Sequence, residues 1–585
     1  MKMVILKYNT VSILLTTSRQ FYIQQCKYHV SKSEGSYLHH VGKKSLLYKT
    51  IGNLVDEAGE RYPNRNAYVL CEENKIITFR ELKEQTDKFA AGLLSFGFKK
   101  DDKIAIWGPN TLEWIISFYG TAKIGAISVL LNPAYQTPEL KYCIEKADVS
   151  GIVTPESFRS HNYFEMINEL YPDLKNASET SLTNVVNTQN LIKVISTTEH
   201  KLSGAYRFKD ILKTEINEEN LNKAKELVNP DDGLCIQFSS GTTGKPKAAL
   251  LTHNNYANNS YTVSQRLELY DKQHKFCLQT PFFHVFASVI GMCGSMHSGT
   301  TIVVPSKSYN PVKTLKAIES EKCTYLNGTP TMHVDVIKVQ RERNFDVSSL
   351  EYAVSGGAPC PPILFKDMLK VLNVQTVKSV YGLTETTAVI FQSLPKENQY
   401  CATETVGHLG DHIEAKVVDE NGKLVPFGKP GELHIRGYCS LLKYYDDEEK
   451  TKETKGSDGW VKTGDQFVLH QNGYGEIVGR LKDMIIRGGE NIFPKEVEDF
   501  LNTHPKILET QVIGIPDERM GEELVAFVRV DENTTITLNE IEDYSSGKIA
   551  KFKIPKYLRI IKEYPKTTSG KIQKYKLKEL VLKEK

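Results

Sequence analysis

Apolar side chains recur at two alternating periods along the first 400 residues of the chain. Residues 78–96 place them at helical spacing behind Thr78, a residue type that caps helix N-termini, and Gly97 follows as a stop signal. The apolar run within residues 102–110 predicts a strand, and residues 111–124 predict a second helix that leads to another strand. Such alternation is typical of layered α/β domains with largely parallel sheets.

Two segments depart from this alternation. Residues 173–232 are rich in Asn, Ser, Thr, Glu and Lys with only short apolar runs, which predicts an excursion at the surface. From residue 404 to residue 480 the chain changes to short strands separated by Gly and Pro turns. This second pattern predicts a small β-rich subdomain.

The last hundred residues predict a separate domain. A helix is expected at 494–502 and strands at 510–515 and 523–530, followed by a basic tail. A chain of 585 residues exceeds the usual size of a single core. We therefore expect an α/β protein with a large N-terminal domain of layered α/β sheets and the β-rich subdomain, 46–480, followed by a small α+β C-terminal domain, 481–585.

The amino-acid composition argues against several classes of protein. The 74 basic and 71 acidic residues give a formal charge of +3, which argues against a nucleic-acid-binding protein. The ten cysteines form no C-x-x-C pair and lack histidines at zinc spacing, so we expect neither a disulfide framework nor a structural metal. No apolar run is long enough for a transmembrane helix, and we expect none. The sequence leaves the oligomeric state open.

Residues 1–40 have a composition of their own. No acidic residue precedes Glu34, whereas Lys2, Lys7, Arg19 and Lys27 lie among Ser, Thr and apolar residues. This pattern predicts a mitochondrial transit peptide, and hence a protein of the mitochondrial matrix; the alternative is a disordered tail. The final Lys-Glu-Lys lacks the peroxisomal tripeptide signal.

The most informative stretch follows an apolar strand and precedes a helix. Glycines let backbone N–H groups converge on an anion, and hydroxyl and ammonium side chains add donors, so this composition predicts a phosphate-binding loop. The Walker A pattern cannot be laid on it. The loop consists of Ser239, Ser240, Gly241, Thr242, Thr243, Gly244, Lys245, Pro246 and Lys247.

Four further motifs accompany this loop. Each follows or ends a predicted strand or lies on a polar turn, and together they supply a backbone slot, an aromatic face, carboxylates and a lysine. They are Gly356-Gly357-Ala358-Pro359, Tyr381-Gly382-Leu383-Thr384-Glu385, Asp465 with Arg480, and Lys571 behind a hydroxyl-rich turn.

In order and spacing these motifs resemble those of the adenylate-forming superfamily, which comprises acyl-CoA synthetases, luciferases and the adenylation domains of peptide synthetases. The resemblance runs from about Leu46 to about Leu580. Within the superfamily, residues 107–110, 132–135 and 483–492 are similar to mitochondrial medium-chain acyl-CoA synthetases. The resemblance implies an ATP-dependent ligase that converts a fatty acid into an acyl-adenylate and then into acyl-CoA, with ATP, Mg²⁺ and coenzyme A taking part.

The resemblance also implies roles for single residues. The loop from Ser239 to Lys247 would hold the β- and γ-phosphates of ATP. The adenine would lie between Gly356, Gly357, Ala358, Pro359 and the ring of Tyr381, with Asp465 and Arg480 at the ribose. Thr384 would contact the α-phosphate, Glu385 would bind Mg²⁺, and Lys571 would bridge the substrate carboxylate and the α-phosphate.

Four residues have roles outside the nucleotide site. Lys482 resembles the hinge of a mobile C-terminal domain, and Gly488 and Gly489 the loop that lines the pantetheine tunnel in the thioester-forming state. His284 lies at the family position beside the acyl pocket, although a histidine among aromatic residues is equally expected in a core. Ala248 departs from the family, which has Gly there, and this puts the geometry of the phosphate loop in question.

Three alternatives remain beside the ligase. A peptide-synthetase adenylation domain would be followed by a carrier domain, and the chain stops soon after Lys571. A luciferase-type oxygenation is compatible with the motifs. A catalytically inactive nucleotide-binding protein should lack Lys571, Glu385 or Asp465, and all three are present.

Overall fold

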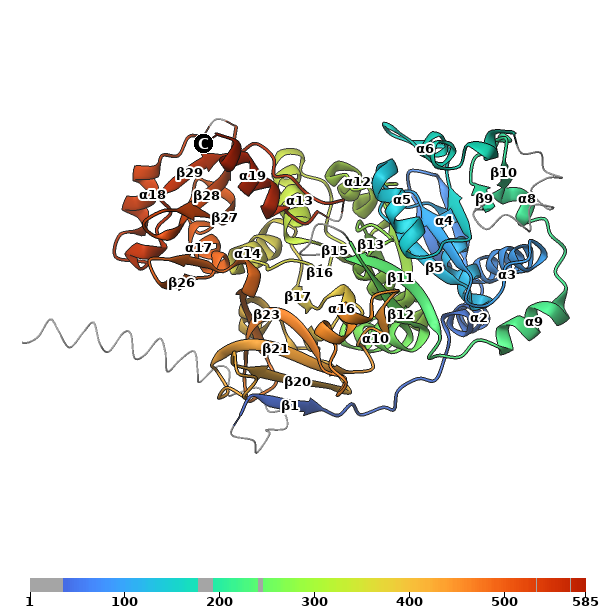
Figure 1. The fold of residues 1–585 in the computed structure, drawn as a ribbon, viewed down its shortest axis with the longest axis horizontal. Helices are drawn as coiled ribbons and strands as arrows, with labels where there is room; N and C mark the ends of the chain where they lie inside the picture. Colours follow the sequence, from blue (N-terminus) through green and yellow to red (C-terminus); the bar gives the residue numbers. More distant parts are fainter. Residues whose placement is uncertain (1–34, 177–192, 240–245, 533, 569, 585) are drawn as a thin grey trace, which may run out of the picture.

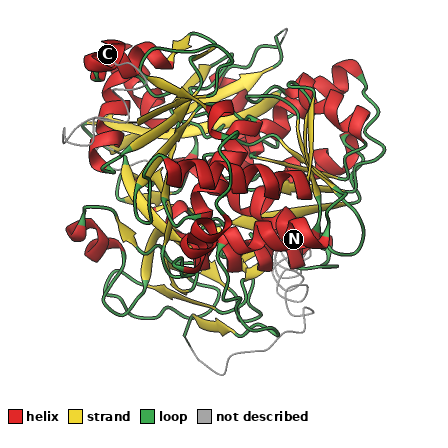
Figure 2. Ribbon diagram, turned by 90° about the vertical axis from the view of Figure 1, so that its right-hand side faces the viewer, coloured by secondary structure: helices red, strands yellow, loops and turns green. Residues whose placement is uncertain are grey.

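The computed structural model describes residues 35–176, 193–239, 246–532, 534–568 and 570–584. The predicted α/β class is confirmed: two large sheets, a smaller antiparallel sheet and a C-terminal α+β domain lie side by side (Figure 1). Helices and strands alternate in layers when the molecule is seen from the side (Figure 2).

The first large sheet has eight strands. Parallel pairing runs from β10 to β11, and the last two neighbours are antiparallel. Its strands, in spatial order, are β10 (Ala205–Arg207), β9 (Lys193–Ser196), β6 (Gly151–Thr154), β4 (Lys103–Trp107), β5 (Ile127–Leu131), β11 (Gly233–Ser239), β12 (Lys247–Thr252) and β22 (Lys443–Tyr444).

The second large sheet has nine strands, parallel in its middle and antiparallel at both ends. Its strands, in spatial order, are β19 (His408–Leu409), β18 (Phe391–Gln392), β17 (Thr376–Tyr381), β16 (Tyr352–Ser355), β15 (Tyr325–Gly328), β13 (Lys275–Leu278), β14 (Thr301–Val304), β2 (Asn66–Leu70) and β3 (Lys75–Thr78).

Helices cover both large sheets. The predicted helices begin at side-chain caps: Thr78 accepts a hydrogen bond from the backbone of Glu81, and Thr111 from that of Trp114. The helices of the N-terminal domain are α2 (Ile51–Arg61), α3 (Phe79–Ser95), α4 (Leu112–Lys123), α5 (Thr137–Lys146), α6 (Tyr163–Leu170), α8 (Phe208–Ile211), α9 (Glu218–Glu226), α10 (His253–Arg266), α11 (Gly294–Ser298), α12 (Pro311–Glu321), α13 (Pro330–Arg343), α14 (Pro362–Val371), α15 (Gln399–Glu404) and α16 (Glu448–Thr454).

A five-stranded antiparallel sheet forms the predicted β-rich part. Its strands are β1 (Tyr37–His40), β20 (Ile413–Val418), β21 (Pro430–Gly437), β23 (Val461–Leu469) and β24 (Gly475–Arg480). One hydrophobic cluster joins this sheet to both large sheets, so the three share a core. Tyr68, Tyr256 and Ile435, from three different parts of the chain, all belong to that cluster and are fully buried.

The C-terminal domain has cores of its own. Successive residues of β27 (Ile507–Asp517) and β28 (Gly521–Val530) point to opposite faces of their sheet. One face packs on α17 (Pro494–Leu501) and α18 (Leu538–Ser545), and the other on α19 (Lys574–Glu584). The sheet also contains β25 (Ile485–Arg487), β26 (Glu490–Ile492) and β29 (Tyr557–Ile560).

The folded chain begins earlier than the expected residue 46. Strand β1 pairs in register with β20, Tyr37 opposite Lys416, and the side chain of Leu38 joins the main core. The sequence did not indicate this, because a four-residue strand carries almost no periodicity and its partner lies far along the chain. The tract expected at 1–40 therefore ends in an ordered strand, and residues 1–34 lie outside the described residues.

The expected surface excursion at 173–232 also needs correction. Its strands β9 and β10 extend the eight-stranded sheet, and Val194 and Ile195 are buried. Residues 177–192 lie outside the described residues. None of the helices that the structure describes is both long and apolar enough to cross a membrane.

Candidate nucleotide and acyl-transfer site

The phosphate loop connects two antiparallel strands. Ser239 at the end of β11 pairs with Lys247 at the start of β12, so the ends of the loop lie together. Ser240, Gly241, Thr242, Thr243, Gly244 and Lys245 lie outside the described residues. Pro246 accepts a hydrogen bond at its carbonyl from the hydroxyl of Tyr142 at 3.0 Å.

The substitution at Ala248 does not disturb the described ends of this loop. Ala248 lies in β12 opposite Phe238, in extended backbone, and its side chain is buried. It is not among the described residues with positive φ, so the freedom of glycine is not needed there.

Glu385 lies beside the phosphate loop. Its Oε1 accepts hydrogen bonds from Ser239 Oγ at 2.7 Å and from the hydroxyl of Tyr444 at 2.8 Å. Lys247 Nζ lies 5.2 Å from the centre of the Tyr444 ring. Burial lowers the pKa of Lys247 against the opposing attraction of Glu385. The fold therefore brings together two motifs that are far apart in sequence, with a carboxylate and an ammonium group at their meeting point.

Strained backbone holds Glu385 and Thr384 in place. Thr387 and Ala388 have φ angles of 51° and 75°, in the left-handed region that side chains other than glycine disfavour. A Cβ on Gly382 would lie 2.1 Å from the carbonyl oxygen of Ala388, so this turn requires glycine. The backbone N–H of Leu441 donates to the carbonyl of Glu385 at 2.8 Å and fixes the turn from outside.

Asp465, Tyr381 and Arg480 form a buried cluster. The Tyr381 hydroxyl donates to Asp465 Oδ2 at 2.6 Å, and Arg480 Nε lies 2.6 Å from Asp465 Oδ1. Asp465 is fully buried, and its Oδ1 receives no hydrogen bond of good geometry within the described part of the chain. Burial raises the pKa of Asp465, against the effects of Arg480 and Tyr381. Oδ1 is thus ion-paired with Arg480 and can still accept a hydrogen bond from a bound ligand.

The glycine-rich turn after β16 borders this cluster. A Cβ on Gly356 would lie 2.5 Å from Val380 Cγ2, on the strand that carries Tyr381, so the two strands approach closely at this point. Gly357 has a φ angle of 81°. Gly357 and Pro359 are exposed and Ala358 is half-buried, so one side of the turn is open. The Tyr381 ring packs on Phe467 with a centroid distance of 5.6 Å.

Lys571 reaches the same region from the C-terminal domain. The surrounding protein and the charge of Arg480 lower its pKa to about 8, against the attraction of Asp465 and Glu385. Lys571 is nevertheless exposed to solvent on one side. The lysine is thus close enough to Arg480, Asp465 and Glu385, which the resemblance assigns to the nucleotide, for their charges to shift its pKa.

His284 lies beside this cluster. It is half-buried between β13 and a π-helix, Phe286–Cys293, and its ring lies 4.3 Å from that of Phe283. Burial and the charge of Lys571 lower the pKa of His284 to about 4, so the imidazole is neutral near pH 7. π-Helical turns frequently occur at functional sites. Both earlier interpretations, acyl pocket and core, are compatible with this position.

The hinge and tunnel residues lie on two exposed turns. Lys482 is exposed in the short turn Leu481–Asp483 after β24. Gly488 and Gly489 form the exposed turn between β25 and β26, with φ angles of 60° and 88°. A Cβ on Gly489 would meet no atom within 4 Å. In this structure the turn therefore faces solvent rather than the site.

Glu385 fits a magnesium ion bound through a substrate. No group of three or more His, Cys, Asp or Glu side chains within the described ranges could hold a metal ion by itself. Mg²⁺ commonly takes one or two protein carboxylates and completes its shell with substrate phosphates and water. A single carboxylate beside a phosphate loop suits that mode of binding.

Tyr444 donates a hydrogen bond to Glu385. The sequence did not indicate this residue, because Tyr444 belongs to none of the recognised motifs.

Comparison with known proteins gives the same picture. Residues 55–445 match the family model of the AMP-binding enzymes, and residues 496–571 match that of the AMP-binding enzyme C-terminal domain. The chain is 41% identical over 573 residues to the medium-chain acyl-CoA ligase ACSF2, mitochondrial, of Danio rerio, covering 96% of this chain and 94% of that protein. It is 36% identical over 537 residues to YngI of Bacillus subtilis (strain 168), covering 91% and 97%.

Solved structures share the fold. The anthranilate CoA ligase AuaEII in complex with anthranoyl-AMP aligns with a TM-score of 0.78 at 23% identity, covering 91% of this chain and 97% of that chain. The motifs, the fold and the full-length similarity agree with one another. The chain belongs to the AMP-binding enzymes, the adenylate-forming superfamily that its motifs resemble.

Proposed function

We propose that the protein is an ATP-dependent, AMP-forming ligase that joins a medium-chain fatty acid to coenzyme A. The observation that carries the proposal is that Lys571, from the C-terminal domain, comes close enough to Asp465, Arg480 and Glu385 for their charges to act on it. This is the arrangement that activation of a carboxylate by ATP needs. The ACSF2 relatives, named medium-chain acyl-CoA ligases, support the choice of substrate.

ATP would bind across the described cluster. The available Oδ1 of Asp465 would accept from a ribose hydroxyl beside Arg480, and the open side of the turn at Gly357 would receive the adenine against Tyr381. Thr384 would contact the α-phosphate, and the loop that begins at Ser239 would hold the outer phosphates. Magnesium on Glu385, when bound, would neutralise phosphate charge.

In the first step an oxygen of the fatty acid carboxylate attacks the α-phosphorus of ATP. An acyl–phosphate bond forms, the bond to pyrophosphate breaks, and pyrophosphate leaves. Both reactants are anions, so fixed positive charge at the point of attack lowers the barrier. Lys571 supplies that charge, and Arg480 adds to it from the nucleotide side.

In the second step the thiolate of coenzyme A attacks the acyl carbonyl. A carbon–sulfur bond forms, the carbon–oxygen bond to AMP breaks, and AMP leaves. Lys571 serves only the first step, so we propose that the C-terminal domain turns about Lys482 between the steps. The same rotation would carry Gly488 and Gly489, now exposed, toward the coenzyme A tunnel.

The domain limits and the cellular location belong to this proposal. We place the N-terminal domain up to residue 480 and the mobile domain at 481–585, because the hydrophobic clusters of the two parts are separate. We propose the mitochondrial matrix as the location, on the basic N-terminal composition and the ACSF2 names. A bacterial relative, YngI, shows that the fold is not restricted to mitochondria.

The proposal is tested by AMP release from the full chain with ATP, Mg²⁺ and coenzyme A, across straight-chain acids from acetate to palmitate. A maximum at medium chain lengths that requires coenzyme A is expected. A maximum at short or long chain lengths would mean that the substrate is not a medium-chain acid. AMP release from no acid, with ATP still bound, would favour the inactive nucleotide-binding alternative.

A further inference from the structure

The orientation of the C-terminal domain decides whether Lys571 reaches the site. Several of the described contacts between the two domains lie on helix α13 of the N-terminal domain. Asp335, near the middle of α13, faces two basic residues of the other domain: Arg529 at the end of β28 and Lys566 on the segment that leads to Lys571.

The geometry of this contact is specific. Arg529 Nη1 donates to Asp335 Oδ1 at 3.0 Å, and Lys566 Nζ lies 3.5 Å from Asp335 Oδ2. One turn earlier on α13, Thr331 Oγ1 donates to Glu509 Oε1 at 3.2 Å. Both oxygens of Asp335 are therefore engaged by cations of the partner domain.

Burial makes Arg529 depend on this contact. Arg529 and Glu509 are each only 8% exposed and lie on paired strands, with Arg529 Nη2 3.6 Å from Glu509 Oε2. Arg529 Nε and Nη2 make no hydrogen bond within the residues that the structure covers. The hydrogen bond from Nη1 to Asp335 thus stabilises a guanidinium group that its own domain leaves incompletely paired, and a buried charge without that acceptor is unfavourable.

The contact at Asp335 is linked directly to the turn that carries Lys571. Lys566 pairs with Ile572 in an antiparallel bridge, and the backbone N–H of Thr567 donates to the carbonyl of Lys571 at 2.8 Å. On its other side the loop is held by Thr568 Oγ1, which lies 2.9 Å from Asn132 Oδ1. A shift of Lys566 therefore moves the turn that carries Lys571.

We propose that Asp335 is a positioning residue that anchors the C-terminal domain, through Arg529 and Lys566, in the orientation that presents Lys571 for acyl-adenylate formation. The proposal rests on the proposed ligase function for its role in the reaction, whereas the anchoring itself is a structural statement. Asp335 touches no reacting atom in this account and acts through Lys571.

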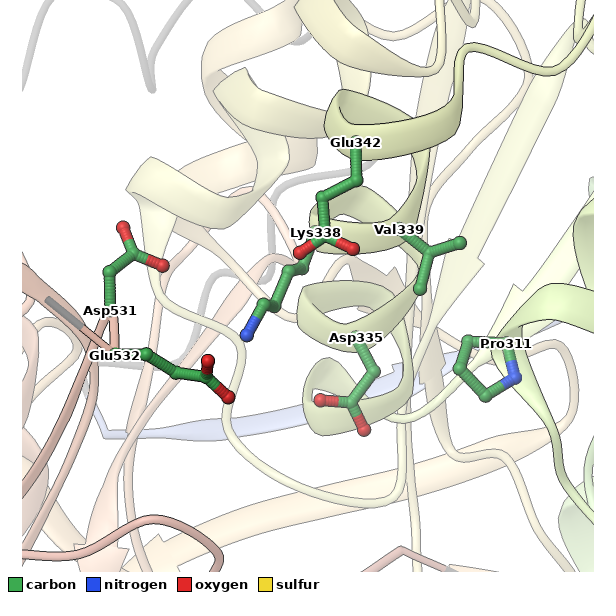
Figure 3. A pocket seen from close by; sticks show the side chains of 7 residues that line it. All are labelled: Pro311, Asp335, Lys338, Val339, Glu342, Asp531 and Glu532. Atoms are coloured by element: carbon green, nitrogen blue, oxygen red, sulfur yellow. The ribbon is translucent and has the colours of Figure 1, made fainter.

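The surroundings of Asp335 allow the anchor to open. Asp335 and Lys338 line a cleft of about 680 Å³ between α13 and the segment after β28, where Asp531 and Glu532 lie (Figure 3). None of the nucleotide-site residues lines this cleft. Water therefore reaches the edge of the contact, and charged groups that separate there become hydrated instead of exposing apolar surface. Such an interface suits a domain that must leave its position in each catalytic cycle.

The experiment compares the two half-reactions in the full chain. Asp335→Asn keeps the shape of the side chain and removes its charge. We expect acid-dependent ATP–pyrophosphate exchange to fall about ten-fold or more, in line with the loss of one partner of a partly buried, hydrogen-bonded ion pair. Thioester formation from supplied acyl-adenylate and coenzyme A should stay within about two-fold of wild type. Asp335→Glu should restore most of the exchange activity.

Asp367→Asn is the matched control. Asp367 of α14 pairs with Arg341 on the same helix α13, at 3.1 Å, but this pair lies within the N-terminal domain. The control should leave both half-reactions unchanged. A loss of similar size in Asp367→Asn would mean that the effect comes from damage to α13, and would overturn the assignment.

Hydrogen exchange of residues 565–572 tests the anchor without reference to activity. Faster amide exchange in Asp335→Asn, but not in Asp367→Asn, supports the anchor even if wild-type protein activates no fatty acid, a result that would overturn only the proposed function. Unchanged exchange of these amides, or equal losses in both half-reactions, would overturn the positioning role.

Discussion

The hydroxyl of Tyr444 donates a 2.8 Å hydrogen bond to Glu385 Oε1, the oxygen that also accepts from Ser239. Strand β22, which carries Tyr444, pairs with β12 directly beyond the phosphate loop. The contact therefore joins the edge of the eight-stranded sheet to the turn after β17 in the nine-stranded sheet. It fixes the carboxylate before any substrate binds.

Replacement of Tyr444 by Phe should weaken adenylate formation and leave the fold intact. A hydrogen bond to a charged group contributes about 1.5–3 kcal/mol, so we expect at least a roughly ten-fold lower rate of ATP–pyrophosphate exchange. The loss should be partly recovered at high Mg²⁺ concentration, because a misplaced carboxylate binds the ion more weakly.

Tyr445→Phe provides the neighbouring control for this prediction. Tyr445 lies beside Lys103 and Lys443 rather than at Glu385. Equal exchange rates in wild type and Tyr444→Phe would show that the hydrogen bond does not orient Glu385.

The pH profile should report the ammonium group of Lys571. The surrounding protein and Arg480 lower its pKa to about 8. Below this value the side chain is charged and can stabilise the developing phosphate charge, and above it the charge is lost. We therefore expect kcat/KM for adenylation, which reflects the free enzyme, to fall as the pH rises through about 8.

Lys571→Arg tests whether this basic limb belongs to Lys571, because guanidinium stays protonated throughout this range. The variant will be slower, since its group differs in shape, but its profile should be flat between pH 7 and 9. An unchanged limb in Lys571→Arg would assign the titration to another group.

Removal of strand β1 should lower stability. β1 pairs with β20 and buries Leu38. In the segment that follows β1, the backbone N–H of Leu47 donates to Asn258 Oδ1 at 2.6 Å, and Asn258 Nδ2 donates to the carbonyl of Leu47 at 3.0 Å. A chain that starts at residue 35 keeps β1 and serves as the reference. A chain that starts at residue 49 should unfold several °C lower. Identical midpoints for the two truncated proteins would show that β1 adds nothing.

Local patterns predicted much of the fold and most of the candidate site. Helix α3 could be read from its Thr78 cap and its apolar period, and Tyr381 and Asp465 stand in motifs whose residue types suit nucleotide binding. These features depend on neighbours in sequence. The structure shows in addition that the two residues meet, at 2.6 Å.

Features that depend on distant partners could not be predicted. Strand β1 is too short to show a period, and Tyr444 carries no motif. Asp335 is one of many charged residues on helices, and only the packing of two domains gives it the neighbours Arg529 and Lys566. The roles of such residues depend on tertiary contacts, and the neighbouring residues in a single sequence do not reveal those contacts.

The half-reactions of Lys571→Ala test the central claim most directly. The variant removes the ammonium group that the C-terminal domain places beside Asp465, Arg480 and Glu385. We predict that it nearly abolishes fatty-acid-dependent ATP–pyrophosphate exchange and still converts supplied acyl-adenylate and coenzyme A into acyl-CoA at a rate close to that of wild type. Equal loss of both half-reactions, or exchange at the wild-type rate, would contradict the account.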